Sequence, residues 1–349
     1  MWDRRSFLGA GLTGLAGATF LTGRLGAALP AVTDAASAAT VLLAECTREQ
    51  RQGLQYKLND EERFGWHFVP LNDTKTKSST RKGVCLDDMT AMAKAAAMQL
   101  LKFATSADGL TWCSDIMERE AILAELEPMN AWYRKPGWYF FTIYGTPANT
   151  GSWAWRVDGH HLSMSVAYRD GLLISASPLF LGLNPVTIKH GQREGERKTM
   201  TASEDLARDL YRMLNADQQK EALLAEHLPE VKALTLAAAT TLAKGISAGK
   251  FSNKQQDALL DVVKHYTGRM HPDVAKLEYD AIVKSGVEKL TFAYSGEAEP
   301  GKRHTYAIQG GAFLIHYLNE QTDPQKNPAN HIHSLFRSRL RDFGGVKPA

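Results

Sequence analysis

The spacing of hydrophobic and polar positions changes several times along the chain. Residues 37–130 mainly show the helical repeat, in which apolar side chains recur every three to four residues. The strongest example is CLDDMTAMAKAAAMQLLKFA, residues 85–104, and Asp87 is in a position to cap its helix. The lysine- and threonine-rich segment NDTKTKSSTRKG, residues 72–83, indicates an exposed loop before it. We therefore expect a largely helical first region.

From residue 137 the spacing changes to that of β-strands. Aromatic and β-branched residues dominate 138–144, 153–168 and 172–177, and glycine-containing turns separate these segments. The sequence RDG at 169–171 is typical of a hairpin turn. This pattern predicts a run of antiparallel strands.

The same two patterns then repeat. Helical spacing returns in residues 201–286, where Ser252 and Pro272 mark helix starts. Strand spacing returns at 289–294 and 305–317.

The order helix, sheet, helix, sheet predicts an α+β fold. We expect a mixed or antiparallel sheet that takes its strands from two separated regions and is flanked by helices at 86–103 and 203–283. One domain over residues 37–349 is the simplest arrangement, and two smaller domains are the alternative.

The first 31 residues have the layout of a twin-arginine export signal. Arg4 and Arg5 precede a weakly apolar run of glycine and alanine, and Arg24 follows that run. Cleavage after Ala31 fits the preference for small residues, with Ala28 as the alternative. We therefore expect the twin-arginine machinery to export the folded protein, which would be periplasmic or secreted.

Charge argues against a nucleic-acid partner. The formal net charge is +3, and Arg4, Arg5 and Arg24 against Asp3 contribute +2 of it, so 3 − 2 leaves +1 for the remaining chain. No basic surplus is left to attract phosphates. Outside the signal segment, no apolar stretch is long enough to predict a membrane span.

Cysteine usage excludes a disulfide framework and argues against a thiolate zinc site. The chain has three cysteines, Cys46, Cys85 and Cys113, and none is part of a CxxC motif. At most one disulfide could form, and the sequence does not determine which pair would form it.

Two pairs of histidines are candidate metal ligands. His331 and His333 are two residues apart, so in a strand they lie on one face and can bind one metal ion together. His160 and His161 are adjacent and would point to opposite faces of a strand, unless Gly159 introduces a bulge. We rank His161, His331 and His333 first as direct ligands. His160 and His316 follow in that order, and hydrogen bonding within the core is the alternative for all five residues.

The chemistry that follows from these ligands is open. Imidazole ligands suit a divalent transition metal, such as Zn, Fe, Mn or Cu. Asp158 and Asp342 are the candidate general bases for a metal-activated water. The signatures HExxH and the P-loop are absent from the sequence.

The chain contains the motifs SWAWRVDGHHLSMS, YAIQG and NHIHSLFR, together with DFG near its end. These motifs resemble an uncharacterised bacterial family, called domain of unknown function 3500. The resemblance implies that GHH, residues 159–161, and NHIH, residues 330–333, are hallmark positions. The chain departs from the family pattern at His316, where glutamate is usual, and at Phe336–Ser338, where Trp-Arg-Asp is usual. The resemblance implies no activity, because the family is named for lacking one.

Three functions are compatible with these observations. The first is an exported metalloprotein with hydrolytic or redox activity on an unidentified small molecule. The second is a non-catalytic exported protein that binds a metal or another ligand. The third is a structural domain whose histidines satisfy hydrogen bonds in the core.

Overall fold

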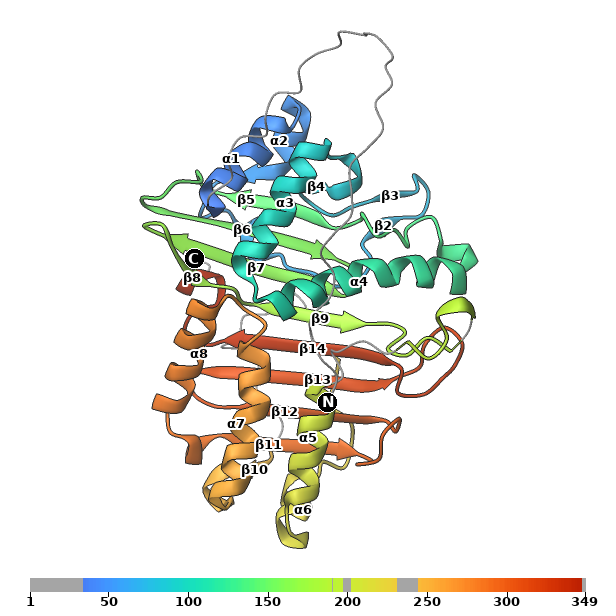
Figure 1. Cartoon of the computed structure of the whole chain (residues 1–349), viewed down its shortest axis with the longest axis vertical. Helices are drawn as coiled ribbons and strands as arrows, with labels where there is room; N and C mark the ends of the chain where they lie inside the picture. Colours follow the sequence, from blue (N-terminus) through green and yellow to red (C-terminus); the bar gives the residue numbers. More distant parts are fainter. Residues whose placement is uncertain (1–33, 190, 197–201, 231–243, 347–349) are drawn as a thin grey trace, which may run out of the picture. The chain divides into compact units, whose positions relative to one another are not determined.

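A twelve-stranded sheet joins the two predicted strand regions (Figure 1). Its main order is β1-β5-β6-β7-β9-β14-β13-β12-β11-β10, while β4 pairs with β5 and β8 pairs with β7. The two regions meet where β9 pairs with β14 in antiparallel orientation. The pair β1–β5 is parallel and the other pairs of this sheet are antiparallel, so the sheet is mixed. The α+β class and the joining of the two regions in one sheet are therefore confirmed.

The computed structural model describes residues 34–189, 191–196, 202–230 and 244–346. The predicted signal segment, residues 1–31, lies outside these described residues. The strands are β1 (Gln55–Tyr56), β2 (Asn72–Asp73), β3 (Ser78–Ser79), β4 (Val84–Cys85), β5 (Phe140–Tyr144), β6 (Ser152–Gly159), β7 (Leu162–Arg169), β8 (Leu172–Ser175), β9 (Leu179–Leu183), β10 (Ile246–Ser247), β11 (Thr291–Gly296), β12 (His304–Gln309), β13 (Phe313–Gln321) and β14 (His331–Ser338).

Helices cover one face of the large sheet (Figure 1). They are α1 (Ala35–Glu45), α2 (Arg48–Leu54), α3 (Ala91–Ala104), α4 (Ala107–Leu126), α5 (Ala202–Met213), α6 (Ala216–Ala222), α7 (Asn253–Thr267) and α8 (Pro272–Lys284). Trp153, Trp155 and Val157 point from β6 into the apolar core that these helices share with the sheet. Among the described residues, no helix has the length and apolar character needed to cross a membrane.

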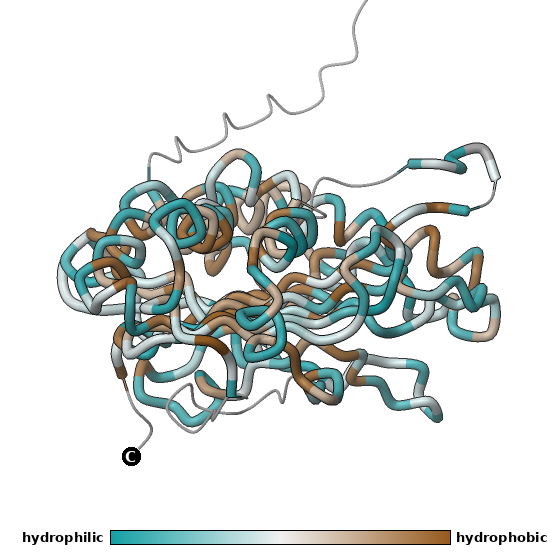
Figure 2. Tube along the Cα trace, turned by 90° about the horizontal axis from the view of Figure 1, so that it is seen from below, coloured by the Kyte–Doolittle hydropathy of each residue, from teal (hydrophilic) through white to brown (hydrophobic). Residues whose placement is uncertain are grey.

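The opposite face of the sheet is more polar and is covered largely by irregular segments (Figure 2). Arg156 and Asp158 alternate with the core residues of β6, so they point to this second face. A smaller apolar cluster, including Phe68, Phe180 and Leu318, packs there. His316, His331 and His333 lie on this second face.

Several predicted helix ends agree with the structure. Ser252 caps α7 through a capping box, and Pro272 is the first residue of α8. The helix after residue 85 begins later than predicted, because Thr90 rather than Asp87 caps α3. Residues 84–85 pair with β5, and the Asp87 N–H donates to the Gly137 carbonyl at 3.3 Å, which delays the helix.

The first region is less helical than the spacing of its residues predicts. Between α2 and α3 the chain forms short strands and turns, including the hairpin β2–β3 in the segment expected to be a loop. This stretch is rich in charged and small polar residues, which provide no apolar face for a helix. The cysteines Cys46, Cys85 and Cys113 are all buried and unpaired.

Candidate metal centre

His160 and His161 form the tight turn between β6 and β7. Gly159 pairs with Leu162, so the two histidines between them close the hairpin. The expectation that they lie within a strand, on opposite faces, is therefore wrong. His161 has a φ of 64°, which few non-glycine residues adopt. Gly159 forms no bulge: a Cβ there would lie 2.1 Å from the Tyr139 ring, so glycine is needed for close packing.

Two backbone hydrogen bonds hold the His161 turn against the polar face of the sheet. The His161 N–H donates to the Phe68 carbonyl at 2.9 Å, and the Gly182 N–H donates to the His161 carbonyl at 2.7 Å. Gly182 also leaves room for the imidazole, since a Cβ at this position would lie 2.9 Å from His161 Cδ2. Gly182 pairs with His333 across β9 and β14. The turn therefore places His161 beside the second histidine pair.

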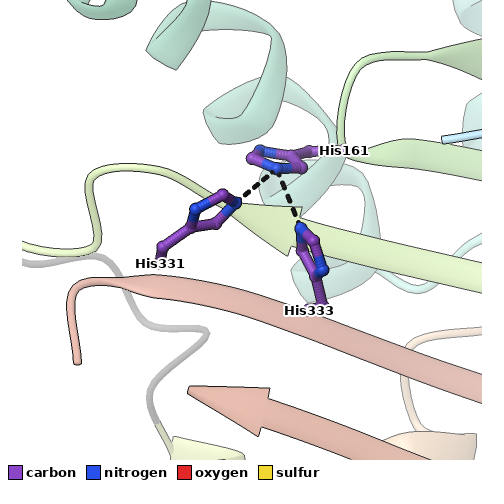
Figure 3. A group of neighbouring side chains, drawn as sticks. All are labelled: His161, His331 and His333. Carbon is purple, nitrogen blue, oxygen red and sulfur yellow. Dashed lines mark hydrogen bonds between the residues drawn. The ribbon is translucent and has the colours of Figure 1, made fainter. Parts of the chain in front are cut away.

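The Nε2 atoms of three histidines converge on one point (Figure 3). His161 Nε2 lies 2.9 Å from His331 Nε2 and 3.2 Å from His333 Nε2. One ligand atom from each of the three residues lies within 4.8 Å of the others. Metal–nitrogen bonds of about 2.1 Å place neighbouring ligand atoms about 3.0–3.4 Å apart at coordination angles of 90–109°. The cluster can therefore hold one metal ion.

Hydrogen bonds orient the two histidines of β14. His333 Nδ1 lies 2.8 Å from Glu230 Oε2, and the backbone of Thr322 hydrogen-bonds to His331. Gln321 Nε2 donates to the same oxygen of Glu230 at 2.8 Å. A carboxylate behind a metal-binding imidazole fixes its tautomer and makes it a better ligand. The sequence gives no signal for Glu230, which lies 103 residues before His333 in a loop.

The three imidazoles lie in a largely buried environment. His161 is 3% exposed and His333 is 6% exposed. Burial, reinforced by neighbouring histidines, holds the pKa of His161 and of His331 well below its usual value. Both rings are therefore neutral at neutral pH, which is the form that binds metals.

Two aromatic rings form an apolar wall beside the cluster. The Phe68 and Phe180 rings stack with their centroids 3.8 Å apart. Their centroids lie 5.5 Å and 5.3 Å from that of His333, respectively. This wall reduces the access of water and strengthens electrostatic interactions at the imidazoles.

His160 lies beside the cluster and is not part of it. Its ring stacks on that of His161 with the centroids 3.7 Å apart. Its Nδ1 lies 2.5 Å from Glu120 Oε1 and 2.8 Å from Arg134 Nη1. Burial raises the pKa of Glu120 to about 8, so this carboxyl can donate a proton to the hydrogen bond. His160 thus supports His161, and the sequence did not indicate the roles of Glu120 and Arg134.

His316 also lies outside the cluster. It pairs with Leu335 on β14, two residues beyond His333 on the same face. Its side chain is 4% exposed, and burial lowers its pKa to about 4. Its Nε2 has no hydrogen-bond partner within the described part of the chain.

Both candidate general bases are engaged in ion pairs. Asp158 Oδ2 lies 2.5 Å from Arg156 Nε, and Asp158 Oδ1 accepts a hydrogen bond from Ser163. Asp342 Oδ2 lies 2.5 Å from Arg337 Nε. Arg337 is four residues beyond His333 on β14, a separation of about 13 Å in a strand. The structure therefore does not bring Asp342 to the cluster, and it gives Asp158 a buried pairing role.

Comparison with known proteins identifies the family of the chain. The family described as "Protein of unknown function (DUF3500)" matches residues 30–345, so the chain belongs to this family. No curated protein matches the chain, and no solved structure does. The GHH and NHIH motifs of this chain meet in one cluster.

Proposed function

We propose that this member of the DUF3500 family is an exported metal-dependent enzyme. Its metal ion, a divalent transition metal, would bind to His161, His331 and His333. The observation that carries this proposal is the convergence of three largely buried imidazoles. The Nε2 atoms of His331 and His333 lie 2.9 Å and 3.2 Å from His161 Nε2.

The number of ligands favours catalysis over a structural or carrier role. Structural metal sites fill every coordination position with protein ligands, whereas catalytic sites use about three and leave a position open. The cluster has three histidines among the described residues. A bound ion would supply Lewis acidity, or electrons if it is iron or copper, to a small-molecule substrate.

The protein groups have separable tasks in this proposal. His331 and His333 are aimed by the Thr322 backbone and by Glu230, respectively. Phe68 and Phe180 limit water on one side. Three neutral imidazoles leave the full positive charge on the ion, which supports polarisation of a bound oxygen atom.

The ligand set bears on the identity of the metal. All three ligands are imidazole nitrogens, which suit Zn, Fe and Cu. Export in the folded state would allow the ion to be loaded in the cytoplasm, where manganese or iron can be trapped before copper or zinc competes. Arg4, Arg5 and Arg24 support this export route.

Elemental analysis of the exported protein tests the proposal. We expect about one transition-metal ion per chain in the full-length protein purified after native export. His331→Ala and His333→Ala should each lose most of this metal, because only two ligands remain. His271→Asn, a change at a histidine outside the cluster that can still cap α8, is the matched control and should keep it. Wild-type protein without stoichiometric metal would refute the proposal.

A second measurement separates an enzyme from a carrier. In cobalt-substituted protein, an open coordination position binds azide or cyanide and changes the visible spectrum. We expect such a change on titration of the wild-type protein. A metal-loaded protein whose spectrum does not respond would have a closed coordination sphere, and the non-catalytic metal carrier would then be the better description.

A further inference from the structure

Asn184 is a buried polar residue at the end of β9, and its amide oxygen lacks a hydrogen-bond partner. The residue is 6% exposed, and its Oδ1 makes no hydrogen bond within the described part of the chain. A buried acceptor without a partner destabilises a fold, whereas a leucine would fill a similar volume without that cost. Contact with a bound ligand is a physical reason for an amide at this position.

The strand register places Asn184 beside the metal cluster. Leu183, the last residue of β9, is opposite Ile332 on β14. The next step of this ladder brings Asn184 opposite His331, and facing residues of antiparallel strands have Cβ atoms about 4.5–5.5 Å apart. The end of β9 and the segment after it accordingly pass beside the His331 ring (Figure 3).

The alternation of side chains places Asn184 on the same face of the sheet as the cluster. Leu183 points into the apolar core that the sheet shares with the helices, so its two neighbours in an extended chain point to the opposite face. One of these neighbours, Gly182, lies against the His161 ring on that face, since a Cβ there would be 2.9 Å from His161 Cδ2. Asn184 is the other neighbour, and it therefore faces the side of the metal ligands.

Hydrogen bonds to Asn330 hold the segment that follows Asn184. The Val186 N–H donates to the Asn330 carbonyl at 3.0 Å, and the Thr187 N–H donates to Asn330 Oδ1 at 2.8 Å. Asn330 Nδ2 in turn donates to the Thr187 carbonyl at 2.9 Å. Because Asn330 directly precedes His331, these bonds fix the segment to the start of β14, next to the first metal ligand of that strand.

We infer that Asn184 contacts the small molecule bound at the open coordination position, and that its amide oxygen accepts a hydrogen bond from this ligand. The inference rests on the proposed metal-dependent function and adds a class of substrate to it. The asparagine side chain is short, so the donor must lie close to the atom that binds the metal. The class is therefore a small molecule with a metal-binding oxygen and a neighbouring O–H or N–H group, such as a hydroxamate or a 2-hydroxy acid.

Two matched probes test the inference on cobalt-substituted full-length protein, with the visible spectrum as the measure of binding. Acetohydroxamate has an N–H group, and N-methylacetohydroxamate has the same metal-binding oxygens without it. We expect the wild type to bind acetohydroxamate more tightly. Asn184→Leu should reduce the ratio of the two affinities about three- to tenfold, which corresponds to the loss of one hydrogen bond. Asn253→Leu, at an exposed amide in the first turn of α7, is the control and should keep the wild-type ratio.

Further measurements decide the remaining outcomes. Asn184→Asp retains an acceptor oxygen and should keep the preference for acetohydroxamate, which a merely structural role of the amide would not produce. If Asn184→Leu fails to fold, Asn184→Ala replaces it, with the same reduction expected.

Azide separates failure of the inference from failure of the proposed function. Azide has no hydrogen-bond donor, so Asn184→Leu should bind it as the wild type does. An unchanged affinity ratio in Asn184→Leu, or loss of its cobalt, would overturn the inference and leave the metal centre in place. A cobalt-loaded wild type that does not respond to azide lacks an open position, and this result would overturn the proposed enzyme and the inference together.

Discussion

His161 Nε2 lies 2.9 Å from His331 Nε2, although 170 residues separate the two histidines. The β6–β7 turn holds the first residue and the start of β14 holds the second, with β9 between the two strands. Rigid strands and backbone hydrogen bonds on both sides of β9 maintain this short distance. Changes to residues that position His161, His331 and His333 should therefore alter metal binding.

Glu230→Gln should weaken metal binding about 10–100-fold while leaving the three ligands in place. The amide lacks the charge that makes His333 a stronger ligand. Competition with a chelator of known affinity measures the effect. Glu226→Gln, an exposed change four residues earlier, is the control and should have no effect. Equal affinities of the two variants would show that Glu230 does not tune the site.

Gly182→Ala should displace the His161 ring. The added methyl group would lie 2.9 Å from both His161 Cδ2 and the Ile332 carbonyl oxygen. We expect reduced metal content and a loss of about 1–3 kcal/mol in the free energy of unfolding, as is usual for an overpacked site. Gly311→Ala is the control, because nothing lies within 4 Å of its new methyl group. Denaturant unfolding and elemental analysis measure both effects, and wild-type metal content in Gly182→Ala would contradict this account of the glycine.

Asp158→Asn should reduce stability and leave metal content unchanged. The change removes the ion pair of the buried Arg156, which keeps its contact with Glu62 at 2.6 Å. We expect the free energy of unfolding to fall by about 1–3 kcal/mol. Asp257→Asn on the exposed surface of α7 is the control. If Asp158→Asn is as stable as the wild type and has lost a metal-dependent activity, then Asp158 serves catalysis rather than pairing.

Glu278 should make the stability of the fold depend on pH. Its side chain is fully buried, and burial raises its pKa from 4.5 to about 7. Because the folded state favours the protonated carboxyl, this group stabilises the fold fully below pH 4.5, and the effect is lost as pH rises to 7. One pKa unit is worth about 1.4 kcal/mol, so the loss is at most about 3 kcal/mol.

Glu278→Gln should remove this dependence. The amide stays neutral, so the variant should be more stable than the wild type at pH 8 and similar to it at pH 4.5. Chemical unfolding at several pH values measures the difference, with Glu288→Gln, an exposed glutamate, as the control. If the free energies of unfolding of the variant and the wild type differ by the same amount at every pH in this range, Glu278 is ionised in the folded protein.

Replacing Arg4 and Arg5 by lysines should block export. The paired arginines are the part of the predicted signal that its receptor reads. Fractionation of cells that produce each form measures the outcome, and a change of Lys57 and Lys82 to arginine serves as the control. Mature protein that still accumulates outside the cytoplasm at the normal level would refute the export route.

Local features of the sequence determined much of the fold. Strand and helix spacing located the two strand regions and the helices between them, because amphipathic periodicity acts within one element. Asp170 and Gly171 both have positive φ values in the predicted hairpin turn, which their side chains tolerate. The same-face spacing of His331 and His333 likewise follows from strand geometry.

Tertiary structure decided how these elements form a site. The φ of 64° at His161 depends on hydrogen bonds to Phe68 and Gly182, which are distant in the sequence. The sequence also did not predict the contact of Glu230 with His333 or the partners of Asp158. The spacing of residues along the chain cannot show which side chains meet across a sheet. Sequence patterns thus supplied the candidate ligands, and long-range packing selected three of them, since convergence depends on strand order and register rather than on local preference.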